Sequence, residues 1–417
     1  MASEYNMEVN VLIVGAGPAG SSLSLFLCKE KIPHLLIDKA VFPRDKVCGD
    51  ALSGKVIDVL KKLNPSLLNK IYEGKDRFTG SYGVKFAAPN GKFIDIPFKK
   101  DLEALANPPG FIVKRFHFDN FLFRQIDESV ATVFQGCMIK ELKPLEGGMD
   151  CLLEREGKEI RVFAKLVVGA EGDRSVVARK LSSIHKEDEH YCAGLRAYYK
   201  GVTGFHEKNF IELHFLKELL PGYLWIFPLP NGEANVGVGM LSKEVGKRKI
   251  NLKKVMLEAI EKNSTIRDRF SNAVLVDDIR GWGLPLGSKK RRISGNNFLL
   301  TGDAASLIDP FTGEGIGNAM VTGMLAARQV KRSLAENRYD DKFLIDYDEE
   351  VYKALWSELK LSHTLQRLSK YPWLFNYVVN KASRNEELRD TITCMFDDLN
   401  IRDRLRSPRF YFKLLVD

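Results

Sequence analysis

The chain has 417 residues, of which 45% are hydrophobic and 28% are charged, and its formal net charge is +9. A chain of this length and composition is expected to bury a large core in two or three globular units. No run of about eighteen apolar residues predicts a membrane-spanning helix, and the six cysteines form no CxxC pair that would indicate zinc or a disulfide framework.

The N-terminus lacks the basic and apolar regions of a signal peptide, and the first strand follows almost at once. We therefore expect a cytoplasmic protein with reduced cysteines. The positive charge is dispersed along the chain, so it favours a basic surface over a nucleic-acid site. No metal-ligand spacing stands out, and we expect no metal site.

The first predicted elements form a β-α-β unit. Residues 9–17 (VNVLIVGAG) are a β-branched run that ends in glycines, and residues 19–31 follow with helical spacing. Residues 34–39 (HLLIDK) are typical of a second buried strand. A strand, a helix and a strand within about thirty residues predict a dinucleotide-binding unit.

The turn inside this unit carries a GxGxxG fingerprint made of Gly15, Gly17 and Gly20. The first glycine allows a tight turn, the second lets a diphosphate approach, and the third permits close packing of helix and strand. The phosphates would then lie at the helix N-terminus, where free N–H groups favour negative charge. Asp38 ends the second strand and suits a pair of ribose hydroxyls.

The middle of the chain alternates between helical and strand-rich segments. Residues 51–75 are predicted to be helical, and residues 76–104 form short strands with glycine and Pro-Asn-Gly turns. Helical spacing returns at residues 116–129, and residues 130–170 alternate as strands. A second strand-rich block runs from about 190 to 280 and is interrupted by a helix at 250–263.

The strand predicted within residues 222–240 (GYLWIFPLPNGEANVGVGM) carries Tyr223, Trp225 and Phe227 at alternate positions. Alternate residues of a strand face the same side. Three aromatic rings on one face would build an apolar wall for a long hydrocarbon or a flat ring. The alternative is that they belong to the core of the sheet.

A second glycine-rich loop follows a buried strand near residue 300, in the stretch LTGDAASLIDPFTGEGIGNAM. Asp303 would lie at the carboxyl end of a sheet, where ligands collect. The glycines at 313, 315 and 317 would bring backbone N–H groups close to a ring or phosphate. Asp303 could instead cap a helix. Because the chain returns to the ligand here, the two glycine-rich sites together favour FAD over NAD.

These elements predict an α/β fold: a Rossmann-like FAD-binding domain with βαβ units, an inserted, mainly antiparallel β-sheet domain, and a C-terminal helical region. The FAD-binding domain is expected to be discontinuous. The predicted division is residues 1–75, 105–188 and 276–340 for FAD, 76–104 and 189–275 for the substrate, and 341–417 for the helical region.

At this point the chain resembles a known family. The segments GAGPAG with Asp38, VKRFHFDNFL, VVGAEGDRSVVARKL and TGDAASLIDPFTGEGIGNAM resemble, in this order, the FAD motifs of the para-hydroxybenzoate-hydroxylase-like flavoproteins. More narrowly, residues 43–53 (PRDKVCGDALS) and 222–240 resemble the geranylgeranyl reductase family. The resemblance covers roughly residues 8–335.

The resemblance implies a set of FAD contacts. Arg115 matches an FAD-contacting arginine, Asp303 matches the aspartate that binds the ribityl chain, and residues 313–317 match the loop at the flavin pyrimidine edge. A surface position at a helix start is the alternative for Arg115. The full predicted set is Gly15, Gly17, Ala19, Gly20, Asp38, Lys39, Arg115, Asp303, Gly313, Gly315, Ile316 and Gly317.

Cys48 is the catalytic candidate, because the resemblance places it near the flavin. A thiol there could give a proton to carbon as the flavin delivers hydride, or it could be a small buried hydrophobic residue. Asp50 stands where the family more often has a second glycine, and it is predicted to bind a polar substrate group. Tyr223, Trp225 and Phe227 complete the predicted substrate site.

The motif at 169–172 departs from the family, because it reads GAEG where GADG is usual. In the family this motif influences both FAD and the nicotinamide nucleotide. The longer Glu171 therefore leaves the electron donor open between NAD(P)H, which we expect, and a protein reductant.

The sequence thus predicts an FAD-dependent oxidoreductase that reduces carbon–carbon double bonds of a prenyl or lipid-like substrate. The alternative is an FAD-dependent monooxygenase or halogenase acting on an aromatic or polyketide-like substrate. The net charge and the aromatic residues Tyr371, Trp373, Phe375 and Tyr377 suit peripheral membrane contact, and covering the core is the other interpretation of that segment.

Overall fold

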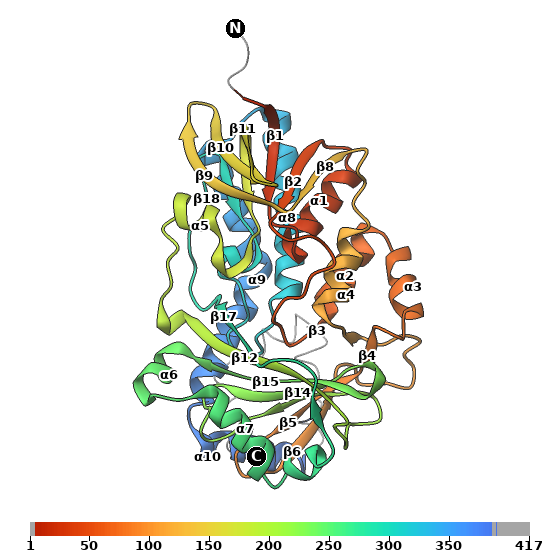
Figure 1. The fold of residues 1–417 in the computed structure, drawn as a ribbon. Helices are drawn as coiled ribbons and strands as arrows, with labels where there is room; N and C mark the ends of the chain where they lie inside the picture. Colours follow the sequence, from red (N-terminus) through yellow and green to blue (C-terminus); the bar gives the residue numbers. More distant parts are fainter. Residues whose placement is uncertain (1–4, 386–388, 390–417) are drawn as a thin grey trace.

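The computed structural model describes residues 5–385 and residue 389, and Figure 1 shows their arrangement. An α/β unit forms the upper part and a second, mainly antiparallel sheet forms the lower part. The helix α9 (Asp341–Leu368) passes from the first to the second, at about 42 Å for 28 residues. This arrangement confirms the predicted fold class.

The first sheet has the strand order β18-β19-β11-β1-β2-β8, and β9 and β10 extend it beside β11. The strands from β19 to β8 are parallel. Their bounds are β1 (Met7–Val14), β2 (His34–Asp38), β8 (Ala131–Gln135), β9 (Cys137–Leu145), β10 (Gly148–Arg155), β11 (Lys158–Gly169), β18 (Ser294–Gly295) and β19 (Phe298–Leu300).

The second sheet has the order β16-β12-β15-β14-β13-β5-β6, with β17 beside β12, and is antiparallel except where β13 meets β5. Its strands are β5 (Gly83–Ala87), β6 (Phe93–Pro97), β12 (Tyr191–Lys200), β13 (Ile211–His214), β14 (Tyr223–Pro228), β15 (Glu233–Leu241), β16 (Val274–Leu275) and β17 (Arg280–Pro285). A small third sheet joins β3 (Ala51–Leu52), β7 (Gly110–Ile112) and β4 (Thr79–Ser81).

Several helices lie where they were predicted, but the helix predicted at 116–129 ends at Phe123, and the helix at Ser242–Arg248 was not predicted. The segment predicted at 51–75 forms two helices, and the helix predicted at 250–263 is confirmed as α7. The bounds of the helices other than α9 are α1 (Pro18–Lys29), α2 (Gly54–Leu63), α3 (Ser66–Glu73), α4 (Arg115–Phe123), α5 (Val176–Leu181), α6 (Ser242–Arg248), α7 (Leu252–Lys262), α8 (Ile316–Glu336) and α10 (Pro372–Ala382).

The predicted domain boundaries stay a prediction. β17 pairs with β12 in the second sheet, although it follows the predicted boundary at residue 275. The part of the C-terminal region beyond residue 385, apart from residue 389, lies outside the described residues. Among the described residues, no helix is long and apolar enough to cross a bilayer.

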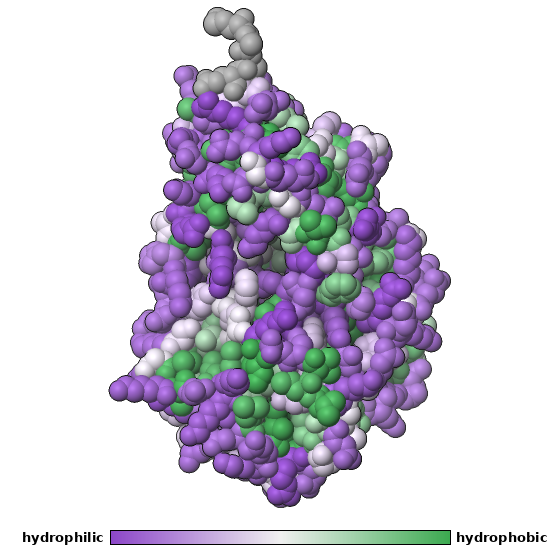
Figure 2. Space-filling view, viewed as in Figure 1, coloured by the Kyte–Doolittle hydropathy of each residue, from purple (hydrophilic) through white to green (hydrophobic). Residues whose placement is uncertain are grey.

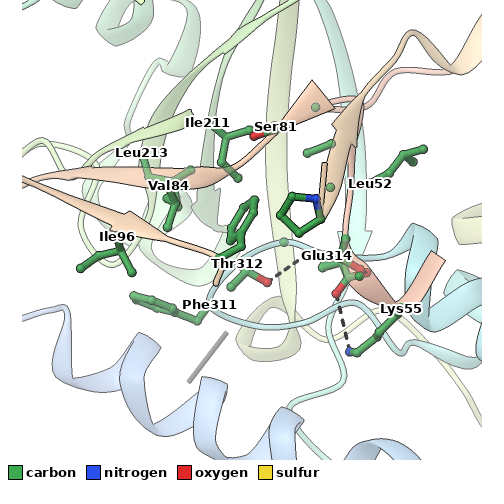
Figure 3. Close-up of a pocket in the computed structure, with 18 of the residues that line it drawn as sticks. Leu52, Lys55, Ser81, Val84, Ile96, Ile211, Leu213, Phe311, Thr312 and Glu314 are labelled. Carbon is green, nitrogen blue, oxygen red and sulfur yellow. Dashed lines mark hydrogen bonds and ion pairs between the residues drawn. The ribbon is translucent and has the colours of Figure 1, made fainter. Parts of the chain in front are cut away.

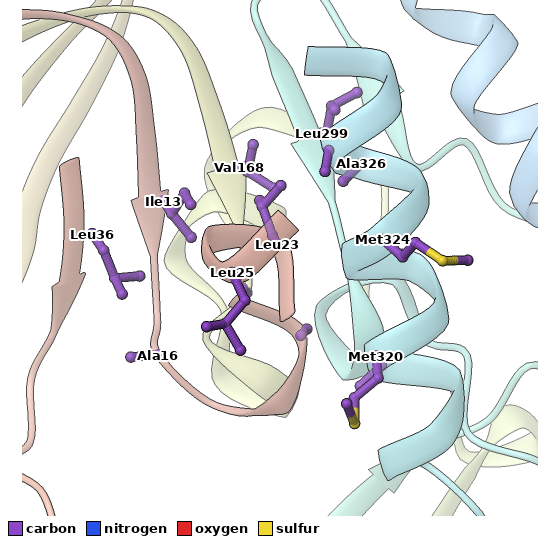
Figure 4. Packing of buried hydrophobic residues seen from close by; sticks show 14 of the residues in the cluster. Ile13, Ala16, Leu23, Leu25, Leu36, Val168, Leu299, Met320, Met324 and Ala326 are labelled. Atoms are coloured by element: carbon purple, nitrogen blue, oxygen red, sulfur yellow. The ribbon is translucent and has the colours of Figure 1, made fainter. Parts of the chain in front are cut away.

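The main core lies between the first sheet and the helices α1 and α8. Residues on β1 and β11 are fully buried there, because these central strands are covered on both faces. Figure 4 shows Ile13 of β1, Val168 of β11 and Leu23 of α1 together with Met320 and Met324 of α8, which all belong to this core. The fold therefore fixes the relative position of these two helices.

Glycine permits this close approach of α8 to α1. A Cβ on Gly323 would lie 2.4 Å from the Ala19 carbonyl oxygen and 3.0 Å from the Leu23 backbone nitrogen. Both neighbours are backbone atoms, so they cannot rotate away as a side chain would. Any larger residue would push the two helices apart.

We expect Gly323→Ala to lower the free energy of unfolding by about 1–3 kcal/mol through overpacking, although alanine is the better helix former by about 1 kcal/mol. The control is Gly246→Ala in α6, where an added Cβ meets nothing within 4 Å. Urea denaturation should show no loss for the control. Equal stability of both variants would contradict the close packing.

Candidate functional site

The carboxyl ends of the central parallel strands lie level at one edge of the first sheet. Val14 pairs with Gly169 on one side and with Ile37 on the other, and Gly169 pairs with Leu300. Ligands of open α/β sheets collect at this edge. The chain places four segments just beyond it, which begin at Gly15, Asp38, Ala170 and Thr301.

The three glycines of the first turn serve different purposes. Gly15 has φ +101°, and a Cβ there would lie 2.6 Å from the Ala170 carbonyl oxygen. A Cβ on Gly20 would lie 1.8 Å from the Gly15 carbonyl oxygen. Gly17 differs, because its Cβ would meet only the Arg44 guanidinium, at 3.6 Å. Two glycines thus allow chain packing, and Gly17 leaves open space at the start of α1.

Asp38 is held at the end of β2 by backbone donors. Its Oδ2 accepts from the Ala16 N–H at 2.7 Å, and its Oδ1 accepts from the Ala40 N–H at 2.8 Å. Each oxygen keeps a further lone pair for a ribose hydroxyl. The neighbouring Lys39 is exposed. The cofactor contacts expected of Asp38 and Lys39 stay predictions.

The second glycine-rich loop packs directly on the first helix. A Cβ on Gly302 would lie 3.2 Å from the Cβ of Ala19 and 3.0 Å from the Cβ of Ala319. Asp303 follows within a short 3-10 turn, Gly302–Ala305. A Cβ on Gly315, the residue before α8, would lie 3.3 Å from the Asp303 Oδ1. The predicted loop and Asp303 are therefore brought together beside α1.

The rest of this loop is equally crowded. Gly313 has φ +74°, and its Cβ would lie 3.0 Å from the Tyr223 hydroxyl. A Cβ on Gly317 would lie 2.1 Å from the Glu314 Oε1, and Ile316 is buried at the start of α8. The glycines therefore let the loop fit between α2 and β14.

Helices α1 and α8 both begin at a glycine that offers no side-chain cap, Gly17 and Gly315. In contrast, α5, α7 and α9 are capped by Ser175, Asn251 and Asp340. At α8 the Glu314 Oε1 accepts from the Gly317 N–H at 3.1 Å, whereas no described side chain caps the start of α1. The free N–H groups and the positive end of α1 suit ligand oxygens, which fits the diphosphate of the predicted FAD.

Two charged groups near these helix ends have no hydrogen bond or ion pair with any residue that the structure describes. One is the carboxylate of Asp303, whose pKa is raised by burial although Lys46 and Arg115 lower it. The other is the ammonium of Lys46, which lies 4.0 Å from the centroid of the Trp282 ring. Burial lowers the pKa of Lys46 to about 8. Both groups keep their bonding capacity for a ligand.

A buried carboxylate organises two guanidinium groups beside Gly17. Arg44 donates to the Asp119 Oδ2 at 2.6 Å, and Arg115 makes two bonds to Asp119, at 2.5 and 2.7 Å. Although burial raises it, the two positive charges hold the pKa of Asp119 below its usual value. Arg115 is buried, so the alternative of a surface arginine is wrong. The cluster keeps one net positive charge, which suits a diphosphate.

A cavity of about 2060 Å³ separates the two units. It begins at Cys48 and residues 313–316 and extends along the second sheet to α10. Figure 3 shows Val84, Ile96 and Leu213 directed into it from the lower sheet. Figure 2 shows this side of the molecule hollowed between the two units. The cavity is thus mostly apolar and opens beside the predicted flavin loop.

The charged side chains at the polar end of the cavity pair with one another. Lys55 of α2 forms ion pairs with Glu358 at 2.8 Å and with Glu314 at 3.6 Å, and it donates to the Asn318 Oδ1 at 2.7 Å. Figure 3 shows the contact between Lys55 and Glu314. These bonds hold the flavin loop to α2 and α9.

The aromatic strand forms one wall of the cavity. Tyr223, Trp225 and Phe227 of β14 line it, whereas Leu224 and Ile226 on the opposite face belong to the core beneath α7. The Tyr223 hydroxyl donates to the Thr312 carbonyl at 2.5 Å, which ties the wall to the residue just before the glycine-rich loop at 313–317. Both interpretations of the strand therefore apply, because one of its faces belongs to the core of the sheet and the other lines the cavity.

Cys48 and Asp50 lie at the junction of cavity and cofactor edge, and both line the cavity. Burial raises the pKa of the Cys48 thiol. The positive charge of Arg115 lowers this pKa, and the negative charge of Asp50 raises it. Asp50 is fully buried, and burial raises its pKa to about 6. Its oxygens accept bonds from Tyr198, Asn235 and the Arg115 backbone. Its predicted contact with substrate stays a prediction.

Glu171 uses its longer side chain to cap α5. It accepts from the Ser175 hydroxyl at 2.6 Å and from the N–H groups of Val176 at 2.9 Å and Val177 at 3.1 Å. This explains how a glutamate is accommodated where the resemblance leads one to expect aspartate.

The sequence reasoning missed Arg44, Lys46 and Asp119 as parts of the site. Arg44 and Lys46 stand inside the PRDKVCGD segment, and Asp119 lies four residues after Arg115 on a helix. That spacing alone predicts an ion pair on one helix face. The partners of Asp50, Tyr198 and Asn235, lie about 150 and 185 residues away in the chain, so no nearby sequence pattern predicts these bonds.

Comparison with known proteins agrees with this geometry. The family model described as an FAD binding domain matches residues 8–359. A curated relative, the digeranylgeranylglycerophospholipid reductase of Methanococcus vannielii, is 30% identical over 416 residues, which cover 98% of both chains.

Two solved structures share the fold. A geranylgeranyl bacteriochlorophyll reductase-like protein from Thermoplasma acidophilum has a TM-score of 0.80 at 22% identity and covers 96% of this chain and 99% of its own. The flavin-dependent brominase Bmp2, as a triple mutant, has a TM-score of 0.77 at 20% identity and covers 97% and 99%. At these identities the two structures show the fold alone.

We expect Gly17→Ala to lower FAD affinity at least about tenfold, or 1.4 kcal/mol, because its methyl group enters the open space at the start of α1. The apoprotein should keep its stability within about 0.5 kcal/mol, since the Cβ meets no packed atom. Flavin fluorescence titration of the apoprotein measures the affinity, with Gly246→Ala as the control. Unchanged affinity would contradict the diphosphate position.

The raised pKa of Asp50 predicts a pH-dependent stability. Between about pH 4 and pH 6 the folded chain keeps a proton that the unfolded chain releases, so stability falls as pH rises and the loss is complete above pH 6. About two pKa units correspond to roughly 3 kcal/mol at most.

Asp50→Asn should remove this contribution, so its free energy of unfolding should fall less than that of the wild type between pH 4 and pH 7. Urea denaturation at both pH values measures the difference. The exposed Glu128→Gln serves as the control and should follow the wild type. The same pH dependence in Asp50→Asn and the wild type would refute the assignment.

Proposed function

The chain belongs to the geranylgeranyl reductase family of FAD-dependent oxidoreductases, and we propose that it reduces carbon–carbon double bonds of a prenyl or similar lipid-like substrate. The observation that carries the proposal is the large apolar cavity that begins at the flavin loop and at Cys48. The name of the relative from Methanococcus vannielii, a reductase of a digeranylgeranyl lipid, supports the same class of substrate.

The size and lining of the cavity support a long apolar substrate. Pockets for drug-sized ligands measure about 300–1,000 Å³, and this cavity has about twice the upper value. Its far side is built from β5, β6 and β13, where Val84, Ile96 and Leu213 expose only hydrocarbon. A polyisoprenoid chain buries its surface there without leaving polar groups unpaired.

The residues at the sheet edge would hold FAD. The N-terminus of α1 and the cluster of Arg44, Asp119 and Arg115 would bind the diphosphate. Asp303 would bind the ribityl chain, and residues 313–317 would contact the ring. When bound and reduced, FAD supplies a hydride, which becomes one new C–H bond of the product. The protein aligns the double bond between Trp225 and the flavin loop and excludes water from it.

Cys48 is the proposed proton donor for the second alkene carbon. Burial raises the pKa of its thiol, so the sulfur carries its proton at neutral pH. Transfer of this proton completes the addition of two hydrogens and leaves a thiolate. Arg115 stabilises that thiolate until a proton from solvent restores the thiol.

We propose NAD(P)H as the electron donor, with a protein reductant as the alternative. The positive charges of Lys46 and Arg174, which flank the Trp282 ring at 4.0 and 5.0 Å, support a donor that carries phosphate. Either donor would supply the two electrons that reduction of the double bond requires.

Peripheral membrane contact by a cytoplasmic protein is the proposed mode of access to the lipid. Within α10 and the residue before it, Phe375 packs on Phe215 with ring centroids 4.3 Å apart, whereas Tyr371 and Trp373 are 54% and 66% exposed. Phe375 therefore covers the core, and the exposed rings of Tyr371 and Trp373, which also line the cavity, suit a bilayer interface.

The test is anaerobic turnover of the FAD-loaded protein with candidate prenyl lipids and NADPH, followed by mass spectrometry of the product. We expect the product to gain two hydrogen atoms without oxygen being present. A product that gains oxygen or halogen, and only in air, would instead support a monooxygenase or halogenase. If the purified protein binds no flavin, the proposed function is refuted.

The role of Cys48 is tested in the same assay. Cys48→Ser should lower the turnover rate about a hundredfold or more, since a positioned proton donor contributes about 10²–10⁴. Cys192→Ser is the matched control, because Cys192 is also a half-buried cysteine but does not line the cavity. Full activity of Cys48→Ser would exclude the thiol as the donor.

A further inference from the structure

Asp50 adopts a backbone conformation that usually belongs to glycine. Its φ is +69°, in the left-handed region, where aspartate is tolerated better than most residues but a glycine would be free of strain. The side chain is nonetheless present and fully buried. A buried carboxylate in a strained position costs stability, so its bonds are the place to seek a purpose.

The carboxylate connects three elements that are far apart in the sequence. Its Oδ2 accepts from the Tyr198 hydroxyl on β12 at 2.7 Å and from the Asn235 side-chain amide on β15 at 2.8 Å. Its Oδ1 accepts from the backbone N–H of Arg115 at 3.3 Å, at the start of α4. Asp50 thereby joins the second sheet to the cofactor side.

Asn235 extends this network to Cys48 and to the aromatic wall. Its amide N–H group also donates to the Cys48 carbonyl at 2.7 Å, and its Oδ1 accepts from the Trp225 indole N–H at 2.8 Å. The orientation of this amide is therefore fixed by three partners, Asp50, Cys48 and Trp225. The turn that holds the thiol and the ring that lines the cavity share one hydrogen-bonded unit.

The turn at residues 48–50 also packs on the aromatic wall. A Cβ on Gly49 would lie 3.2 Å from the Phe227 ring and 3.7 Å from the Trp225 indole nitrogen. Within the turn, the Asp50 N–H donates to the Cys48 sulfur at 3.4 Å. A shift of Asp50 would therefore move the thiol relative to the cavity.

Charged groups surround the thiol from both sides. Arg115 and Lys46 lower the pKa of Cys48, whereas burial and the carboxylate of Asp50 raise it. The charge of Asp50 is itself supported by the hydrogen bonds of Tyr198 and Asn235 and by the positive charges of Arg196 and Arg115. A proton donor must hold its proton until the reaction, so the balance of these charges matters.

We propose that Asp50 is a positioning residue for Cys48: its carboxylate ties the turn at residues 48–50 to the aromatic strand and places a negative charge beside the thiol, against the positive charge of Arg115. This inference rests on the proposed function for its catalytic meaning. The position and charge of the thiol are testable without turnover.

An acid suits this position better than its amide. Tyr198, Asn235 and the Arg115 backbone all present donors, and a carboxylate accepts from all of them. An asparagine would direct its own N–H group at one of these donors. Asn235 cannot turn its amide round without losing its bonds to Cys48 and Trp225.

The experiment uses the FAD-loaded full chain with Asp50→Asn and Asp50→Gly, since both replacements tolerate the left-handed backbone. The rate of Cys48 alkylation by iodoacetamide is followed against pH, with the modified peptide quantified by mass spectrometry. We expect the pH midpoint of alkylation to move down by about one unit in both variants, because a negative charge beside the thiol is lost.

The matched control is Asp348→Asn, another buried aspartate, which accepts from the Ile293 N–H far from the cavity. It should leave the alkylation midpoint of Cys48 unchanged. Turnover of the prenyl substrate should fall at least about tenfold in the Asp50 variants through misplacement of the thiol, while FAD content stays that of the wild type.

An unchanged alkylation midpoint in both Asp50 variants would overturn the proposal, and so would an equal shift in Asp348→Asn. If the wild type reduces no prenyl lipid, the proposed function fails, yet the alkylation midpoints still decide the role of Asp50. If alkylation shifts as expected but turnover does not, Asp50 sets the charge of the thiol without positioning it for the reaction, and the proposal is likewise overturned.

Discussion

The site depends on the contact between α1 and α8, two helices whose starting points are about three hundred residues apart. Gly323 allows α8 to approach the backbone of α1 at Ala19 and Leu23, and the side chain of Ala19 also packs against Gly302. This packing brings the starts of both helices, each preceded by a glycine, to one sheet edge. Without the contact, the two glycine-rich loops would be separate turns and would not form one cofactor site.

The second sheet is attached to this edge by a few bonds that also shape the cavity. Tyr223 bonds to Thr312, just before the glycine-rich loop at 313–317, and Asp50 bonds to Tyr198 and Asn235. The fully buried Arg196 pairs with Asp45 at 2.7 Å, close to Cys48 in the chain. Each of these bonds joins the second sheet to the loops beside the first sheet. The geometry of the cavity is therefore coupled to the loop that carries Cys48.

Sequence reasoning succeeded where the signal was local. The GxGxxG turn, the strand before Asp303 and the alternation of Tyr223, Trp225 and Phe227 all follow from periodicity and glycine placement over short stretches. It fell short where partners are distant. Nothing near Asp50 indicates that Tyr198 and Asn235 will meet it, because that meeting depends on how the second sheet folds back onto residues 48–50.

Charges without a protein partner separate the functional part of this edge from the structural part. Glu171, Asp38 and Lys55 stand near the site, yet their bonds to the protein are well supplied. Asp303 and Lys46 are different, since neither has a bond to a described residue and burial disfavours the charge of both. Burying such groups destabilises the empty fold, and a ligand that bonds to them removes this cost. A cofactor that bonds to them would therefore contribute to the stability of the fold as well as to its chemistry.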